Sequence, residues 1–333
     1  MQLADRLDLP RGYSARPYRG QTDHAAMALV LDAYRRHHGV PERAGVEQID
    51  HAFTGVVAAD VALELAIVEC SGDVVAYCHP RPIPRDGGRA DLVVWAPTAP
   101  DHIGRELFDA MLAAQHDHLR GHADPAATTR WRGRASHRGP GSAPVGEAAW
   151  FEAHGYAATH WDASLRRPHL DDIPDLPLPD GIEVRPVRPD EIRTIVEDHH
   201  EAFRGEWDFA EAGPDDIDDI LVDPVIDHTL WQVAWQGDTV VGQVKPYIDH
   251  AENAERGYRR GYAEYISTHH DHRNRGIAGA LLARALVALR DRGMTEAVLG
   301  VDVHNPGGAF HLYRKLGFEV TGYEAYYTRP FEG

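Results

Sequence analysis

The chain has 333 residues and a mass of 36.9 kDa, so at about 150 residues per domain two domains are expected. Its 43% apolar and 26% charged residues are typical of globular proteins and exclude disordered and collagen-like chains. The net charge of −18 argues against a nucleic-acid partner, because binding to phosphates depends on clustered lysine and arginine. The sequence has no uncharged apolar stretch of about 18 residues, and its start, MQLADRLDLP, lacks the apolar core of a secretory signal. A cytoplasmic protein without a membrane partner is therefore expected.

The first informative elements along the chain are two alternating apolar runs at 64–78, ELAIVECSGDVVAYC, joined by a Gly-Asp turn as in a β-hairpin. Cys70 and Cys78 lie on its two arms, about 13 Å out of register if Cys70 pairs with Val74. A disulfide needs a much closer approach of the two residues. Both cysteines are therefore expected to be free.

The segment 166–180, RRPHLDDIPDLPLPD, contains four prolines and four aspartates and has no amphipathic period. Such a composition predicts a stiff, extended linker. The order of elements before it recurs after it: the hairpin at 64–78 matches LWQVAWQGDTVVGQV at 230–244, and WFEAHGY at 150–156 matches LYRKLGF at 312–318. We therefore expect an internal duplication, with domains at 1–168 and 181–333 and a linker at 169–180.

The second half continues with a strand that ends near Thr268 and a helix whose apolar face recurs along GIAGALLARALVAL at 276–289. AVLGVDV at 297–303 predicts another strand. A further helix is expected to begin at Asn305 as its N-cap, with Pro306 at its first position, and to end at Gly317. This alternation of strands and helices is typical of an α+β domain.

The turn between that strand and the first helix has the chemistry of a phosphate site. Gly276, Gly279 and the small Ala278 let backbone amides approach a diphosphate, and the helix N-terminus adds a partial positive charge. Arg273 and Arg275 supply full charges. The structural alternative is a turn into a helix that glycine makes possible, with arginines that have no role in binding.

Two motifs resemble the GNAT acyltransferase superfamily. RNRGIA at 273–278 resembles its acyl-CoA pyrophosphate loop, and NPGGAFHLYRKLGF at 305–318 resembles its second hallmark, a helix with Asn, Ala, Tyr and Gly-Phe. The resemblance implies an α+β fold of two tandem GNAT-like domains, each with a mixed, mostly antiparallel central sheet flanked by helices. It also implies an acetyl-CoA-dependent N-acetyltransferase that transfers the acyl group directly to a primary amine, without a metal.

The first half departs from both motifs. Thr98, Asp101 and Ile103 stand where the loop has Arg, Gly and Ala, and Phe151 stands where the second helix has Tyr. A carboxylate repels phosphate, and a β-branched side chain blocks close backbone approach. The first domain is therefore expected to be a degenerate, non-catalytic copy.

The resemblance also implies roles for residues of the second domain. Tyr313 matches the general acid that protonates the departing thiolate, and Glu264 is the first candidate for the base, ahead of His269 and His270. A backbone amide of Ile266 or Thr268 is expected to face the thioester oxygen. The whole acyl-CoA site is expected to comprise Ile266, Thr268, Arg273, Asn274, Arg275, Gly276, Ile277, Ala278, Gly279, Ala280, Asn305 and Ala309.

The acceptor side is indicated by 197–227, which contains twelve carboxylates and a single base, Arg204. Such a field would attract a cationic amine, and Glu201 and Trp207 are the candidate acceptor-binding residues. A solvated acidic face is the alternative. The expected partner is thus a small-molecule amine.

Three further points complete the expectations. A metal site at His269, His270 and His272 is not expected, because neighbouring residues of a strand point to opposite faces. The tandem architecture also resembles mycothiol synthases, which acetylate a cysteinyl amine, and a non-catalytic acyl-CoA sensor is a further alternative. The sequence leaves a homodimer open.

Overall fold

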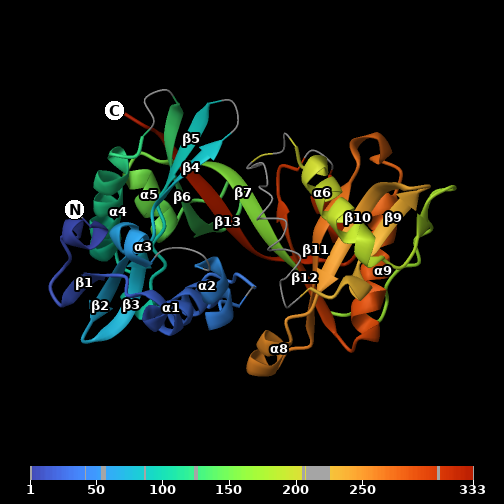
Figure 1. Ribbon diagram of the computed structural model, residues 1–333, viewed down its shortest axis with the longest axis horizontal. Helices are drawn as coiled ribbons and strands as arrows, with labels where there is room; N and C mark the ends of the chain where they lie inside the picture. The colour runs from blue at the N-terminus through green and yellow to red at the C-terminus, as the bar shows by residue number, and fades with distance from the viewer. Residues whose placement is uncertain are drawn as a thin grey trace. The chain divides into compact units, whose positions relative to one another are not determined.

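The structure is a computed structural model that describes residues 2–41, 43–53, 58–85, 88–123, 127–204, 207, 226–305 and 308–332. It divides into two compact units, Met1–Asp162 with Gly322–Gly333, and Ala163–Thr321. The chain passes from one unit to the other within β7 (Ala157–Arg167) and again within β13 (Glu319–Pro330) (Figure 1). Within the described ranges, each helix is too short or too polar to cross a lipid bilayer.

The first unit is built from two groups of strands with helix α4 between them. Its elements are β1 (Tyr13–Pro17), α1 (His24–His37), α2 (Val46–Ala52), α3 (Ala58–Glu64), β2 (Ala66–Cys70), β3 (Asp73–Cys78), β4 (Arg81–Arg85), β5 (Arg89–Val93), α4 (Arg105–Arg120), β6 (Thr128–His137) and α5 (Glu147–Ala153). The strand orders are β1-β2-β3 and β4-β5-β6-β13-β7. Leu107 and Met111 of α4 pack with the first group, whereas Leu112 and Leu119 pack with Trp131 of the second. Helix α4 therefore buries two faces.

The second unit is a sheet in the order β7-β12-β11-β10-β9-β8 with helices on both faces. Its elements are β8 (Glu183–Val184), α6 (Ile192–Ala202), β9 (Gln232–Gln236), β10 (Thr239–Tyr247), α8 (His250–Arg256), β11 (Arg260–Thr268), α9 (Ile277–Asp291), β12 (Glu296–Asp302) and α10 (Ala309–Lys315). A Cβ on Gly242 would meet Ile277 of α9, whereas the next side chain, Gln243, donates to the Ile195 carbonyl of α6 at 2.9 Å. Since neighbouring strand residues face opposite ways, α9 and α6 cover opposite faces.

The last strand of each half of the sequence continues into the other unit. β13, from the second half, pairs antiparallel with β6 from Tyr323 opposite His137 to Pro330 opposite Arg130. β7, from the first half, neighbours β12 in the second unit. The observed division thus differs from the expected ranges 1–168 and 181–333, because residues 322–333 complete the sheet of the first unit.

Several sequence expectations are confirmed locally. Both Gly-Asp hairpins form, as β2–β3 and β9–β10, and Cys70 and Cys78 are free thiols, with Cys70 opposite Asp73. The expected apolar face of α9 is buried, from Ile277 to Leu289. The start of α10 is a correction: it begins at Ala309 rather than at Pro306, because Gly308 has φ +70° and cannot continue a right-handed helix. Pro306 itself lies outside the described residues.

Candidate functional site

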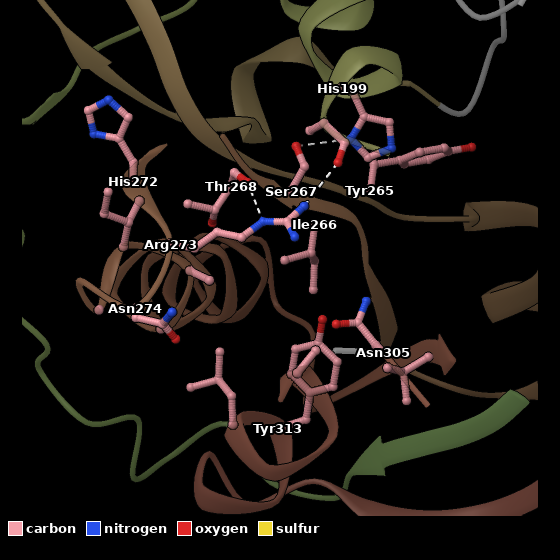
Figure 2. Close-up of a pocket in the computed structure, with 18 of the residues that line it drawn as sticks. His199, Tyr265, Ile266, Ser267, Thr268, His272, Arg273, Asn274, Asn305 and Tyr313 are labelled. Atoms are coloured by element: carbon pink, nitrogen blue, oxygen red, sulfur yellow. Dashed lines mark hydrogen bonds between the residues drawn. The ribbon is translucent and has the colours of Figure 1, made fainter. Parts of the chain in front are cut away.

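The second unit contains a cavity of about 950 Å³ (Figure 2). It lies between the C-terminal parts of β11 and β12, with the start of α9, helix α10, the end of α6 and the linker around it. The side chains and backbone that line it are Leu176, Pro177, His199, Ala202, Phe203, Glu264, Tyr265, Ile266, Ser267, Thr268, His272, Arg273, Asn274, Gly276, Ile277, Ala278, Gly279, Gly300, Val301, Asp302, Asn305, Ala309, Leu312 and Tyr313. Twelve of the residues expected from the sequence are therefore brought together here.

The opening arises where two parallel strands part. β11 and β12 pair in register from Arg260 opposite Glu296 to Tyr262 opposite Val298. Further along, the side chain of Glu264 bridges the two strands, with Oε1 accepting a hydrogen bond from the Gly300 amide at 2.8 Å. The cavity begins at this bridge, so its floor carries a carboxylate held by a backbone amide.

A β-bulge shapes one wall of the cavity. In the β10–β11 ladder, Gln243 pairs with Ser267 and Lys245 pairs with Glu264, so two residues of β11, Tyr265 and Ile266, oppose one residue of β10. Tyr265 has φ +53°, which is strained for a bulky residue. A bulge removes residues from regular pairing and redirects their backbone groups. Ile266, the second residue of the bulge, lines the cavity.

The loop that enters α9 has the backbone of an anion cradle. Asn274 and Gly276 both have left-handed conformations, with φ +61° and +85°. A Cβ on Gly276 would find open space, with no heavy atom within 4 Å. Gly276 is also the N-cap of the 15-residue helix α9, whose N-terminus carries partial positive charge. A phosphate group therefore fits here.

The arginines of the loop make hydrogen bonds within the second unit. Arg273 donates to the Thr268 carbonyl at 3.3 Å and to the Ala202 carbonyl at 3.1 Å, so it ties the end of β11 to the end of α6 (Figure 2). Arg275 is exposed and donates to His272 Nδ1 at 2.9 Å.

Two small residues at the start of α9 serve packing. A Cβ on Gly279 would lie 3.3 Å from Leu312 and 3.5 Å from Leu176, so glycine lets α9 approach α10 and the linker. The Ala280 amide donates to the Gly276 carbonyl at 3.1 Å and its side chain is buried. The first turn of α9 is thereby held in place beside the cradle.

Tyr313 points from α10 toward Ile266 across the cavity (Figure 2). Its side chain is 5% exposed, and burial, with a further contribution from the nearby Glu264 charge, raises the pKa of its phenol well above the usual value. The phenol therefore keeps its proton at neutral pH. Asn305 and Ala309 line the same end of the cavity.

Sequence reasoning missed His199 of α6. Its Nδ1 and the Ser267 hydroxyl share a hydrogen bond of 3.2 Å, and its ring contacts Phe203. Burial, together with the positive charge of Lys245, lowers the pKa of this imidazole well below its usual value, so the ring is neutral. No local motif marks His199, because only the packing of α6 on β11 brings it to the cavity.

The linker was also missed as part of the site. Leu176 and Pro177 line the cavity beside α9. A proline-rich segment is readily interpreted as a spacer, and nothing in its composition indicates the surface on which it packs.

Other candidates lie away from the cavity lining. Glu201 is exposed and accepts a hydrogen bond from Arg204 at 2.9 Å, and Trp207 is not among the lining residues. Most of the acidic segment, at 205–206 and 208–225, lies outside the described residues. His269 and His270 follow the end of β11, where their rings lie 4.3 Å apart. The expectation that they point to opposite faces of a strand was therefore wrong, because the strand has already ended.

A comparison with known protein families finds a match for the part of the chain that forms this cavity. Residues 192–318 match the acetyltransferase (GNAT) family. The second unit carries a GNAT acetyltransferase domain. The matched segment therefore identifies the second unit as an acyltransferase domain, and the co-substrate in this family is an acyl-CoA. No curated protein matches the chain.

Solved structures extend the similarity of fold over both units. A GCN5-related N-acetyltransferase from Sphaerobacter thermophilus is 21% identical, with a TM-score of 0.70 over 97% of this chain and 96% of that one. A tandem GNAT protein from the clavulanic acid biosynthesis pathway is 15% identical, with a TM-score of 0.64 over 96% and 98% of the two chains. Saccharomyces cerevisiae N-myristoyltransferase is 13% identical, with a TM-score of 0.55 over 98% and 81%. The expected tandem GNAT-like α+β fold is thus confirmed.

Proposed function

We propose that this GNAT enzyme is an N-acetyltransferase that transfers the acetyl group of acetyl-CoA directly to a primary amine of a small, cationic molecule. One observation carries the proposal: a single cavity joins the α9 cradle, the β11 bulge, the Glu264 carboxylate and the buried Tyr313 phenol. These are the parts that direct acyl transfer requires.

The cradle accounts for binding of the co-substrate. The amides at Gly276, Ile277 and Ala278 would hold the pyrophosphate at the N-terminus of α9, where the dipole favours anions. The Ile266 amide would donate to the thioester oxygen as negative charge develops on it. Thr268, Asn274, Asn305 and Ala309 line the route between the two ends.

The proton steps can be assigned to two side chains. As the amine nitrogen bonds to the acyl carbon and the carbon–sulfur bond breaks, Glu264 takes the proton from the amine and Tyr313 gives its proton to the departing sulfur. The raised pKa of Tyr313 supports the second role, because the phenol stays protonated until the thiolate appears. The neutral ring of His199 is the alternative base, since it lines the same cavity.

The carboxylates of the cavity support a cationic acceptor. Glu264 and Asp302 line it from the two diverging strands, and Asp198 of α6 lies within range of the charges of His269 and Lys245. An amine presented as an ammonium group would be attracted by this charge before it loses its proton.

We also propose that the first unit is a degenerate, non-catalytic copy, and the small cavity around Phe151 supports this. The cavity that includes Phe151, the counterpart of Tyr313, has a volume of only about 30 Å³, and its walls include Phe108 and Trp95. Phe151 fills the space beside Gly133, where a Cβ would lie 2.4 Å from its ring. Acyl-CoA would find no room there, and the position of Tyr313 is occupied by a side chain without a hydroxyl group.

The proposal is tested by incubating the protein with acetyl-CoA and a panel of amines while free thiol is followed. The panel contains polyamines, aminoglycosides, amino sugars and a cysteinyl glycoside. Turnover with a cationic amine that falls with added salt is expected, because salt screens attraction between charges. Saturable binding of acetyl-CoA with no turnover across the panel would indicate a sensor and overturn the proposal.

A further inference from the structure

A cluster of two imidazoles and one carboxylate lies in the first unit, away from the acyl-CoA cavity. His118 lies in the last turn of α4 and His122 follows just after that helix, while Glu64 is the last residue of α3. One oxygen of Glu64 contacts His118 Nε2 at 2.6 Å, and the other lies 3.5 Å from His122 Nε2. One atom of each residue lies within 4.8 Å of the others. Both oxygens of the carboxylate thus face imidazole nitrogens.

The hydrogen bonds of His122 fix which of its nitrogens carries the proton. Its Nδ1 lies 3.2 Å from the His118 carbonyl oxygen, which can only accept. Nδ1 therefore donates, and in the neutral ring Nε2 presents a lone pair. A histidine that ligates a metal commonly donates its other N–H to a backbone carbonyl in this way.

This arrangement leaves two acceptors facing each other. His122 Nε2 and a Glu64 oxygen are 3.5 Å apart with no proton between them in the neutral ring. Two ligands of a tetrahedral zinc ion, with bonds of about 2.0–2.2 Å, lie about 3.4 Å apart. A divalent cation would therefore satisfy both acceptors, and His118 Nε2 would exchange its 2.6 Å hydrogen bond to Glu64 for a bond to the ion.

The spacing and exposure also suit an ion. His118 and His122 are four residues apart at the end of α4, so they lie on one side of it. The side chain of His118 is only 6% exposed, whereas those of Glu64 and His122 are 36% and 37% exposed, so an ion can enter from solvent. The mixture of imidazole and carboxylate ligands favours zinc over calcium or magnesium.

We propose that Glu64, His118 and His122 form a binding site for a divalent transition-metal ion such as zinc. The ion is held by His118 Nε2, His122 Nε2 and a Glu64 oxygen, with water at the remaining position. It links the end of α3, which leads into β2, to the end of α4. This site is independent of acyl transfer.

The test uses the full-length protein, stripped of metal with a chelator and titrated with zinc chloride in a calorimeter. The variants are His122→Ala and Glu64→Gln, both at partly exposed side chains. His51→Ala, which removes an exposed histidine in the last turn of α2, is the matched control. Because His269, His270 and Asp271 also cluster, the informative quantity is the difference between each variant and the unsubstituted protein.

We expect both variants to lose one equivalent of zinc or to bind it at least about tenfold more weakly, while His51→Ala binds as the unsubstituted protein does. Cobalt(II) supplies a second measurement, because its visible absorption reports ligation directly and should lose intensity in both variants. Equal zinc affinity and an equal cobalt spectrum in all four proteins would overturn the proposal. Absence of zinc binding by the unsubstituted protein would do so too and would indicate a protonated His122 paired with Glu64.

Discussion

The Tyr313 side chain is deeply buried and lies at the wall of the cavity. Tyr313→Phe removes the proton donor and little else. We expect kcat to fall by at least roughly tenfold, the low end of what a general acid contributes, while the affinity for acetyl-CoA changes by no more than a few-fold. Steady-state kinetics and calorimetric titration measure the two quantities.

Tyr327 provides the matched control. It is also fully buried, burial raises the pKa of its phenol to about 12, and its hydroxyl has no partner among the described residues. It lies in the first unit, outside the cavity. Tyr327→Phe should leave turnover unchanged, and full activity in Tyr313→Phe would remove that residue from the mechanism.

Lys245 of β10 is buried, and the free energy that burial of its ammonium group costs in folding depends on pH. It is 3% exposed, and burial lowers its pKa to about 7, opposed by the charge of Asp198. The rings of Trp231 and Tyr265, 5.2 and 5.1 Å from Nζ, compensate in part. Since the unfolded lysine has a pKa of about 10.4, the folded protein binds fewer protons between pH 7 and 10, and its stability rises across that window.

Lys245→Met should therefore raise the melting temperature more at pH 6 than at pH 10. At pH 6 the gain should be on the order of 5 °C, because the cost of burying a charge is then at its full value. Lys315→Met changes the other lysine of the chain, which is exposed on α10, and should have no effect at either pH. An equal gain at both pH values in Lys245→Met would contradict the assigned pKa.

At the scale of an element, helix α9 begins at the phosphate cradle and is followed at its C-terminal end by a terminating glycine. Gly276 precedes the helix with φ +85°, and Gly293 follows it with φ +86°; neither has a heavy atom within 4 Å of a Cβ position. Alanine at either site costs about 1–2 kcal/mol, because L-residues disfavour this conformation. The two alanine substitutions are thus expected to cause similar backbone strain.

Gly276→Ala and Gly293→Ala should lose similar stability in denaturant titrations. Only Gly276→Ala should raise the KM for acetyl-CoA severalfold, since its methyl group would stand where phosphate approaches the amides. If both variants raised the KM equally, the effect would come from strain in α9 rather than from the cradle.

At the scale of the whole molecule, each unit depends on a strand from the other half of the sequence. Ala325 and Tyr327 of β13 are fully buried in the first unit, in a cluster with Leu92 and Trp131. Removing 322–333 would expose this cluster and leave the edge of β6 unpaired. A break in the linker would not yield two complete domains.

We expect the chain that ends at Thr321 to lose amide-exchange protection throughout the first unit. A chain that lacks only Glu332 and Gly333 keeps β13 and Phe331, and should exchange as the full-length protein does. Unchanged protection after removal of 322–333 would show that the first unit holds together without β13.

Local patterns in the sequence determined several of the secondary-structure elements and the loop that enters α9. The two hairpins, the apolar face of α9 and the loop from Arg273 to Gly279 follow from periodicity of two or 3.6 residues and from glycines at turns, which act between near neighbours. Twelve of the site residues implied by the resemblance of two such motifs to GNAT proteins also line the cavity.

Tertiary structure alone decided the rest. The parting of β11 and β12, the position of the bulge at Tyr265, the entry of His199 and Leu176 into the cavity and the exchange of β7 and β13 all depend on which distant segments pair. The free energy of such pairing is shared between residues more than a hundred positions apart, as in β6 with β13, so no window of sequence contains it.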